Sequence, residues 1–364
     1  TDTDTDTDTD TDTDTDTDTD PDPIEIAGSW TDSWGGEQII DDVLWSDLWG
    51  NVFAISSYDN DADYAVAQNS SMNSYNPDLW SKFSWTWSSE GELFFCQGTY
   101  DAATEQEAMD AASPDATDLD TGCGGFGWTE LRTPIALAGS YDDSWGSQHS
   151  VDPWKWISDS SYGSSGYNIT SYDNDAGWIV AQNQSDNSYN PELWSRFNWM
   201  TNDEGQIFYC QIAYAEESEQ AALDAADADT SDIDGGCGGF GWTEMRVSLA
   251  IGGTWDDSWG SQYQIDAWSW TSSSDWGTSG YDITSYDNDA GWIVAQNQSD
   301  NSYNPDLWSR FNWTTNADGQ LFYCQAAYDA ATEEDAADAA DADVADLNAG
   351  CGGFSWTALN VAAE

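Results

Sequence analysis

The chain has 364 residues, of which 69 are Asp or Glu and only 6 are Lys or Arg, so its formal net charge is -63. Hydrophobic residues make up 39% of the sequence and aromatic residues 14%, which excludes a wholly disordered chain. The negative charge excludes nucleic acid and anionic membrane surfaces as partners, because both would be repelled. No run reaches the roughly 18 apolar residues that a membrane helix needs, so we expect no membrane insertion.

Residues 1–23 open the chain with ten Thr-Asp pairs and end at Pro21 and Pro23. Carboxylates at every second residue repel one another, and this favours an extended thread with the hydroxyls on one side. A row of hydroxyls suits dense O-glycosylation, whereas a flexible unmodified linker explains the same residues. The candidate glycosylation sites are Thr1, Thr3, Thr5, Thr7, Thr9, Thr11, Thr13, Thr15, Thr17 and Thr19.

Three copies of one unit follow this tract. The segment "SYDNDADYAVAQN" at 57–69 returns as "SYDNDAGWIVAQN" at 171–183 and at 285–297, which is a constant spacing. The period is too long for a solenoid and matches the size of an ordinary small domain. The repeats therefore predict three tandem domains, at 24–133, 134–247 and 248–364.

The cysteines follow the same period. Each copy carries two of them at a fixed separation, which predicts one disulfide per domain and an oxidising, extracellular setting. A zinc or redox site is disfavoured, because the sequence has no CxxC and His149 is its only histidine. The predicted disulfide residues are Cys96 with Cys123, Cys210 with Cys237, and Cys324 with Cys351.

Alternating apolar and polar residues predict strands in every copy. In the third copy these are "GYDITSYDND" and "GWIVAQN" around a turn, then "WSRFNWTT", "GQLFYCQAAY" and "GGFSWTAL". The Ala-rich acidic stretch 330–347, with counterparts at 102–119 and 216–233, predicts a helix between the cysteines. We expect a mainly β protein of three antiparallel sandwich or barrel domains, each with a short helix clipped to it by the disulfide.

The D-N-D element of each turn carries closely spaced carboxylates. Such spacing resembles the first half of a calcium loop, and a plain hairpin turn explains the same residues without a metal. We favour the turn and keep calcium as the weaker alternative. The candidate ligands are Asp59, Asp61, Asp173, Asp175, Asp287 and Asp289.

The sequence contains 24 tryptophans, more than three small cores can easily bury, so we expect some on the surface. Exposed rings beside Asn, Gln and Asp are typical of sugar-binding sites. Trp154 with Trp156, and Trp268 with Trp270, are separated by one residue, so the members of each pair are predicted to share a face. These four are the candidate ligand-binding residues, and core packing is the alternative.

No catalytic constellation repeats along the chain. Tyr263 stands where the second copy has His149, and the cysteines are predicted to be paired, so we expect no enzyme. The equivalent cations Lys82, Arg196 and Arg310 are expected to pair with nearby carboxylates for structural reasons. Sequons at Asn69, Asn168, Asn183, Asn297 and Asn312 carry little weight in a chain rich in Asn and Ser.

The Thr-Asp tract ahead of Cys- and Trp-bearing repeats resembles bacterial cell-surface lipoproteins, in which such a tract is a tether. Short Thr-rich repeats are also similar to the cores of extracellular glycan-coated fibrils. The segments "NSYNPDLWSRFNW" and "GCGGFGWT" look like repeats of uncharacterised secreted bacterial proteins. The lipidated cysteine of the lipoprotein plan is not among these residues. The resemblance implies a place at the cell surface.

The sequence predicts an extracellular structural protein of a bacterial surface stalk or fibril. In this hypothesis a glycosylated Thr-Asp thread carries three β domains, and the partners are covalent glycans and other copies of the chain. The alternative is a multivalent carbohydrate-binding adhesin or lectin, assisted by calcium, with the tract as a tether. Neither function requires a cofactor.

Overall fold

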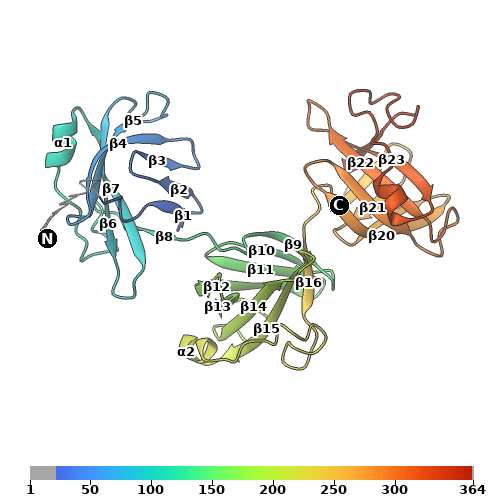
Figure 1. The fold of residues 1–364 in the computed structure, drawn as a ribbon, viewed down its shortest axis with the longest axis horizontal. Coiled ribbons are helices and arrows are strands. Elements are labelled where there is room, and N and C mark those ends of the chain that lie inside the picture. Colours follow the sequence, from blue (N-terminus) through green and yellow to red (C-terminus); the bar gives the residue numbers. More distant parts are fainter. Residues whose placement is uncertain (1–21, 363–364) are drawn as a thin grey trace, which may run out of the picture. The chain divides into compact units, whose positions relative to one another are not determined.

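The computed structural model describes residues 22–362, so the expectations for the Thr-Asp tract fall outside the described residues. The described chain forms three closed barrels, each of eight antiparallel strands (Figure 1). It divides into two compact units, of which the first ends at Pro134 and contains one barrel, and the second contains the other two. The predicted mainly β fold is confirmed, and of the two arrangements left open the protein adopts the barrel.

The three barrels share one element order. The first contains β1 (Gly28–Asp32), β2 (Glu37–Ile40), β3 (Leu44–Asp47), β4 (Val52–Asp59), β5 (Tyr64–Asn69), β6 (Trp80–Trp87), β7 (Leu93–Ala102), α1 (Glu105–Asp110) and β8 (Thr129–Arg132). The second contains β9 (Gly139–Asp143), β10 (Gln148–Val151), β11 (Lys155–Ser160), β12 (Gly163–Asp173), β13 (Trp178–Asn183), β14 (Trp194–Thr201), β15 (Ile207–Glu216), α2 (Glu219–Leu223) and β16 (Thr243–Val247). The third contains β17 (Gly253–Asp257), β18 (Gln262–Ile265), β19 (Ser269–Ser274), β20 (Gly277–Asp287), β21 (Trp292–Asn297), β22 (Trp308–Thr315), β23 (Leu321–Ala330), α3 (Glu333–Ala337) and β24 (Thr357–Val361).

Every strand pairs with its neighbours in sequence, and the last strand of each barrel pairs with the first. Closure leaves no unpaired sheet edge. Because the strands run up and down, successive connections lie at alternating ends of the barrel. One end receives the chain as it enters the barrel, and we call it the plug end. The opposite end carries the connections after the first, third, fifth and seventh strands, and we call it the mouth.

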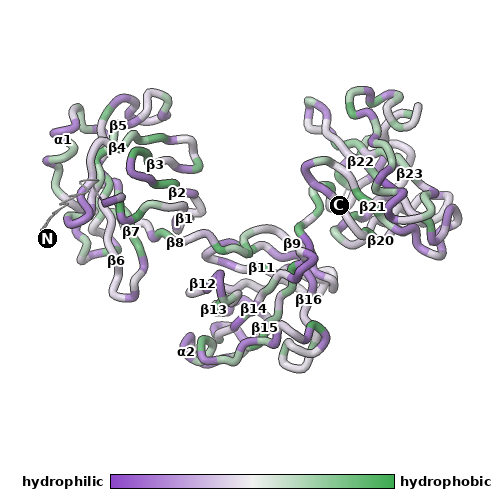
Figure 2. The backbone as a smooth tube through the Cα atoms, in the orientation of Figure 1, coloured by the Kyte–Doolittle hydropathy of each residue, from purple (hydrophilic) through white to green (hydrophobic). Residues whose placement is uncertain are grey.

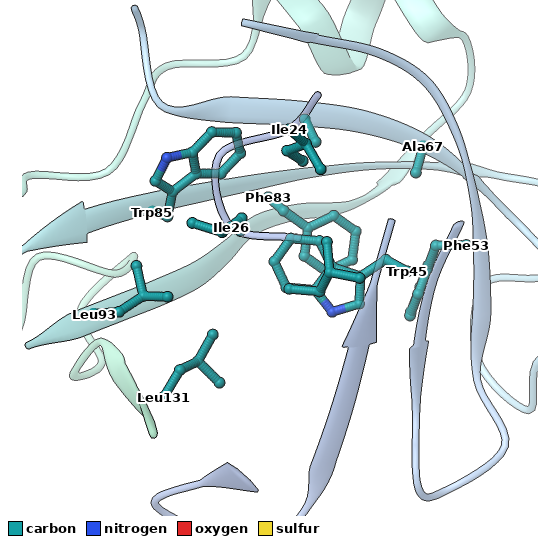
Figure 3. Packing of buried hydrophobic residues seen from close by; sticks show 11 residues of the cluster. Ile24, Ile26, Trp45, Phe53, Ala67, Phe83, Trp85, Leu93 and Leu131 are labelled. Carbon is teal, nitrogen blue, oxygen red and sulfur yellow. The ribbon is translucent and has the colours of Figure 1, made fainter. Parts of the chain in front are cut away.

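Two aliphatic side chains of the entering segment close each plug end. In the first barrel they are Ile24 and Ile26, which are buried in the core next to Trp85 and Phe83 (Figure 3). Their counterparts in the other barrels are Ile135 and Leu137, and Leu249 and Ile251. Each entering segment is therefore part of the barrel that follows it, rather than a free linker.

The middle residue of the D-N-D turn anchors this segment. Asn60 donates from its side chain to the carbonyl of Pro23 and accepts from the amide of Glu25. Asn288 makes the same pair of bonds with Ser248 and Ala250 in the third barrel. The turn that the sequence analysis considered for calcium thus has a structural purpose, which is to hold the plug.

Stacked aromatic rings fill the barrel interior. Trp45 stacks on Phe83 with ring centroids 4.3 Å apart, and the pair Trp270 and Phe311 repeats this at 4.5 Å. With the plug below and these rings in the middle, the barrel encloses a packed core and not an open cup. In Figure 2 hydrophobic and hydrophilic segments interleave along every barrel. No helix between residues 22 and 362 has the length and apolar character to cross a membrane.

The three predicted disulfides are present, joining Cys96 to Cys123, Cys210 to Cys237, and Cys324 to Cys351. They indicate an oxidising environment. The predicted helices are present but much shorter than the Ala-rich stretches. Beyond each helix, aspartates such as Asp118 bond backbone amides two or three residues further on, which favours turns over a longer helix.

A buried cation fixes each helix to the barrel wall. Arg310 donates to the carbonyl of Ala337 at the end of α3 and pairs with Asp341, and Arg196 does the same with Leu223 and Asp227. The predicted pairing with carboxylates is therefore confirmed for the two arginines. Lys82 instead donates to the backbone carbonyls of Met109, in the last turn of α1, and of Ala111, directly after it, since the first copy has Ser113 where the others have this aspartate.

We predict that Ile251→Ala lowers the free energy of unfolding of the third barrel by about 2–5 kcal/mol, because it opens a cavity in a fully buried plug. Urea unfolding followed by tryptophan fluorescence measures the effect. The matched control is Val361→Ala, since Val361 is 79% exposed and its truncation should change stability by less than about 0.5 kcal/mol. Equal effects of the two substitutions would contradict the role of Ile251 as a buried plug of the third barrel.

Candidate functional site at the barrel mouths

Exposed aromatic residues gather at the mouths. Four positions repeat in all three barrels: the turn after the first strand, the turn after the third, the loop after the fifth, and the end of the seventh strand. The residues are Trp34, Trp145 and Trp259; Trp49, Tyr162 and Trp276; Tyr75, Tyr189 and Tyr303; and Tyr100, Tyr214 and Tyr328. More than half of each of these side chains is exposed to solvent. Exposed apolar groups that cluster rather than scatter mark an interaction site.

A further exposed ring repeats beside each disulfide, at Phe126, Phe240 and Phe354. Each lies on the segment that returns to the last strand, and its carbonyl and amide form a small bridge with Cys123, Cys237 and Cys351 respectively. These rings belong to the covalently clipped segment and not to the four mouth positions.

A buried carboxylate holds the tryptophan of the first mouth turn. Asp143 accepts hydrogen bonds from the backbone amides of Trp145 and Ser147, and Asp32 and Asp257 act in the same way in the other barrels. Burial raises the pKa of Asp143, but hydrogen bonds from His149 and the two turn amides outweigh it and hold the pKa below its usual value. The carboxylate therefore stays ionised and keeps the turn, and its exposed ring, in place.

The other carboxylate oxygen meets a different residue in each barrel. His149 Nε2 lies 3.1 Å from Asp143 Oδ2, while its Nδ1 accepts a hydrogen bond from Trp156 Nε1. This pattern assigns the neutral tautomer with the proton on Nε2. Gln38 makes the equivalent two bonds, from Nε2 to Asp32 and from Trp45 to its Oε1. The lone histidine thus has a structural role that a glutamine fills elsewhere.

A second buried network supports the loop after the fifth strand. Asn69 donates from Nδ2 to the carbonyl of Asn76 and accepts at Oδ1 from Ser81, and Gln97 donates to the same Ser81. The network recurs in the other barrels around Asn183, Ser195 and Gln211, and around Asn297, Ser309 and Gln325. Asn76 and Asp78 in this loop have φ values of 49° and 62°, which lie in the left-handed region that is unfavourable for residues other than glycine. The hydrogen-bond network holds the loop in this conformation.

In the first barrel this loop borders a pocket of about 280 Å³. The lining residues are Asn51, Phe53, Asn69, Asn73, Tyr75, Asn76, Gln97 and Tyr100. All eight are neutral, in a chain with 69 acidic residues. The pocket combines aromatic rings with amide side chains, which is the composition of a small-molecule site with a few orienting polar groups.

The sequence-predicted ligand residues lie elsewhere. Trp156 and Trp270 are only 1% exposed and belong to the cores, so the core-packing alternative is confirmed for these two residues. Trp154 and Trp268 lie directly before β11 and β19, at the plug end. Trp268 packs under the guanidinium of Arg246, which is 3.8 Å from the ring centroid. The spacing of the tryptophans predicted that the two members of a pair share a face. It could not show that Trp156 and Trp270, which lie within the strands, point into the barrel.

The candidate calcium ligands are used in turns. Asp59 Oδ1 accepts from the amides of Asp61 and Ala62, and Asp173 and Asp287 repeat this geometry. Across residues 22–362 no three His, Cys, Asp or Glu side chains are grouped so that they could hold a metal ion. These bonds support the hairpin interpretation, and calcium binding stays a prediction.

Sequence analysis missed the mouth residues. Three of the sequon asparagines, Asn69, Asn183 and Asn297, turn out to be 3% exposed and to organise the loop network. The recurring "NSYNP" segments were visible as repeats, but repetition alone does not separate a binding loop from a packing motif. Comparison with known protein families, curated proteins and solved structures finds no match to this chain.

We predict that His149→Gln preserves the stability of the second barrel, because glutamine makes the same two bonds in the first. His149→Leu should destabilise it by about 3–5 kcal/mol, since a buried carboxylate and an indole N–H lose their partner. Urea denaturation of the full chain distinguishes the two variants. If leucine were tolerated as well as glutamine, the proposed role of the network would be wrong.

Proposed function

We propose that this chain is a multivalent carbohydrate-binding protein that works outside the cell, with one site at each barrel mouth. The observation that carries the proposal is the repeated set of exposed rings at the mouths, which in the first barrel lie next to a neutral pocket lined by amides. The disulfides support the location, because they form and persist in oxidising compartments.

The chemistry of the mouth suits a neutral sugar. Tyr75 and Tyr100 offer flat apolar faces at the rim, on which the C–H face of a sugar ring can stack. Asn and Gln side chains both donate and accept hydrogen bonds, and so do sugar hydroxyls. An anionic ligand would be repelled by the net charge of -63.

The mouth is also preorganised. The aspartate network holds the first turn, and the Asn69, Ser81 and Gln97 network holds the loop that carries Tyr75. A loop that is already ordered loses little conformational entropy when a ligand binds. This favours recognition by a surface site even though the barrel interior is filled.

Three equivalent mouths on one chain favour avidity. Individual sugar sites bind weakly, and linked sites on a glycan-covered surface convert later contacts into intramolecular ones. In this proposal the Thr-Asp tract serves as a tether.

A structural role in a surface stalk or fibre is our second proposal. It is favoured by the short connections between barrels, since Thr133 and Pro134 alone separate β8 from the next plug residue, Ile135. Intact mass before and after β-elimination tests it, using protein from the native source. A large loss that maps to residues 1–19 supports a glycan-bearing thread, and a bare mass of 39.9 kDa speaks against it.

For the binding proposal we predict that the triple variant Tyr75→Ala, Tyr189→Ala, Tyr303→Ala loses glycan binding by about tenfold or more, equivalent to about 1.4 kcal/mol per site. The matched control replaces the same residues by Phe, which keeps the ring and should keep most of the binding. Each tyrosine is at least 80% exposed, so both variants should unfold like the wild type.

Glycan arrays with and without a calcium chelator provide the measurement, and thermal unfolding provides the folding control. Flat array profiles for the wild type would refute the proposal. Equal losses in the Ala and Phe variants would show that ring stacking is not the contact.

A further inference from the structure

The third barrel packs against the outer wall of the second, and Asp142 is at the centre of this contact. Its side chain is 4% exposed and accepts at Oδ2 from the backbone amide of Ala267, at 3.0 Å. Its backbone carbonyl accepts from Trp268 Nε1, at 3.1 Å. Arg246 covers the Trp268 ring and donates to the carbonyl of Ile283. The contact thus joins β9 and β16 to the loop between β18 and β19.

A cleft of about 420 Å³ lies at this contact, and each of the two barrels contributes half of its lining. The half from the second barrel includes Asp142, Gln148 and Ser160. The equivalent residues of the third barrel line a hollow of about 470 Å³, and they include Asp256, Gln262 and Ser274. The wall that receives a neighbouring barrel in the second barrel is therefore open in the third. We call this open wall the tail face.

The tail face contains a hydrogen-bond acceptor without a donor. Asp256 is the equivalent of Asp142, since it pairs with Asn360 on the last strand as Asp142 pairs with Arg246. Asp256 Oδ1 is buried, and within residues 22–362 it accepts no hydrogen bond. A buried carboxylate oxygen without a partner is unfavourable, so this position favours a donor supplied from outside.

The first barrel carries the matching donor. Its loop between β2 and β3 is equivalent to the loop that docks in the third barrel, with Asp42 in place of Ala267. The Asp42 carboxylate accepts from the amide of Ile24 in its own barrel, whereas among the described residues the Asp42 amide donates no hydrogen bond. The second barrel cannot supply this donor, because Pro153 has no amide hydrogen. We call this loop of the first barrel the head face.

The side chains around these two polar groups change together. The cation and the ring that hold the contact within the chain are both replaced, by Asn360 on the tail face and by Val43 on the head face. The head face exposes Val43 by 67% and Ile39 by 52%, and the tail face exposes Val361 by 79%. Apolar groups gathered on two faces with matching polar groups mark an interaction surface.

We propose that the tail face of one chain binds the head face of a second copy. In this contact the Asp42 amide donates to Asp256, and the apolar side chains of the two faces cover one another. Because the contact joins two different faces, every added copy leaves the same two faces free for the next. This inference rests on the second proposed function, the surface fibre, and names the contact that would build it.

Charge and access fit this mode of assembly. Trp145 is 82% exposed although the third barrel packs against the second, so a contact of this kind leaves the mouth accessible. Copies with a net charge of -63 repel one another, and salt screens this repulsion. The proposed contact contains no ion pair that salt would weaken. Self-association should therefore increase with ionic strength.

Sedimentation velocity of the full chain tests the contact, over a range of concentrations in about 0.05 M and about 0.5 M NaCl. We expect the average mass of the wild type to rise with concentration, and to rise further at high salt. Val43→Asp should weaken self-association by about tenfold or more, because it places a charge in an apolar contact. The matched control is Val344→Asp, since Val344 is 57% exposed and lies outside both faces.

A second variant tests for a gain. Asn360→Arg together with Val43→Trp rebuilds on the free faces the pair that joins the second and third barrels. Both residues occur at these positions in other barrels, so the fold accepts them. The double variant should strengthen self-association by about fivefold or more. Thermal unfolding of each variant provides the folding control.

The outcomes separate the contact from the fibre. Self-association that Val43→Asp and Val344→Asp weaken equally overturns the contact and leaves the fibre to another surface. A wild type that stays monomeric at every concentration in both salts also overturns the inference. The fibre proposal then fails with it only if β-elimination of the native protein shows that the Thr-Asp tract is bare.

Discussion

The insertion of the entering segment into the end of each barrel is the contact on which the rest of the structure depends. Residues such as Ile24 and Ile26 complete the apolar core that the stacked pair Trp45 and Phe83 begins. An eight-stranded barrel has room for side chains or for one small ligand, and here side chains fill it. The opposite end, where the turns and loops are free to vary, is therefore the place of the proposed binding site.

Buried polar groups at the mouth show how three copies can keep one geometry with different residues. Gln38, His149 and Tyr263 each complete the hydrogen bonding of an equivalent aspartate. A buried carboxylate tolerates any partner that donates in the right place, and it does not tolerate an apolar one.

Four of the six Lys and Arg side chains of the chain have structural contacts. Lys82, Arg196 and Arg310 fix the short helices to the barrel walls, and Arg246 covers Trp268. The chain carries 69 acidic residues against 6 basic ones, and this excess of negative charge disfavours anionic ligands. The pocket of the first mouth is lined by neutral residues only, although the chain as a whole is strongly acidic. This difference in composition supports the choice of the pocket as a candidate site.

The sequence by itself determined the repeats, the disulfide pairing within each copy, and five of the eight strands of each barrel, because spacing and alternation are local properties of a chain. It also placed each helix correctly, although turn-forming aspartates shortened it. Only the tertiary structure decided that Trp156 and Trp270 face inward, since alternation fixes a common side but not which side becomes the core. Barrel closure likewise brought Asn51, Tyr75 and Gln97 from three separate strands and loops to one pocket, and no local pattern records such long-range contacts.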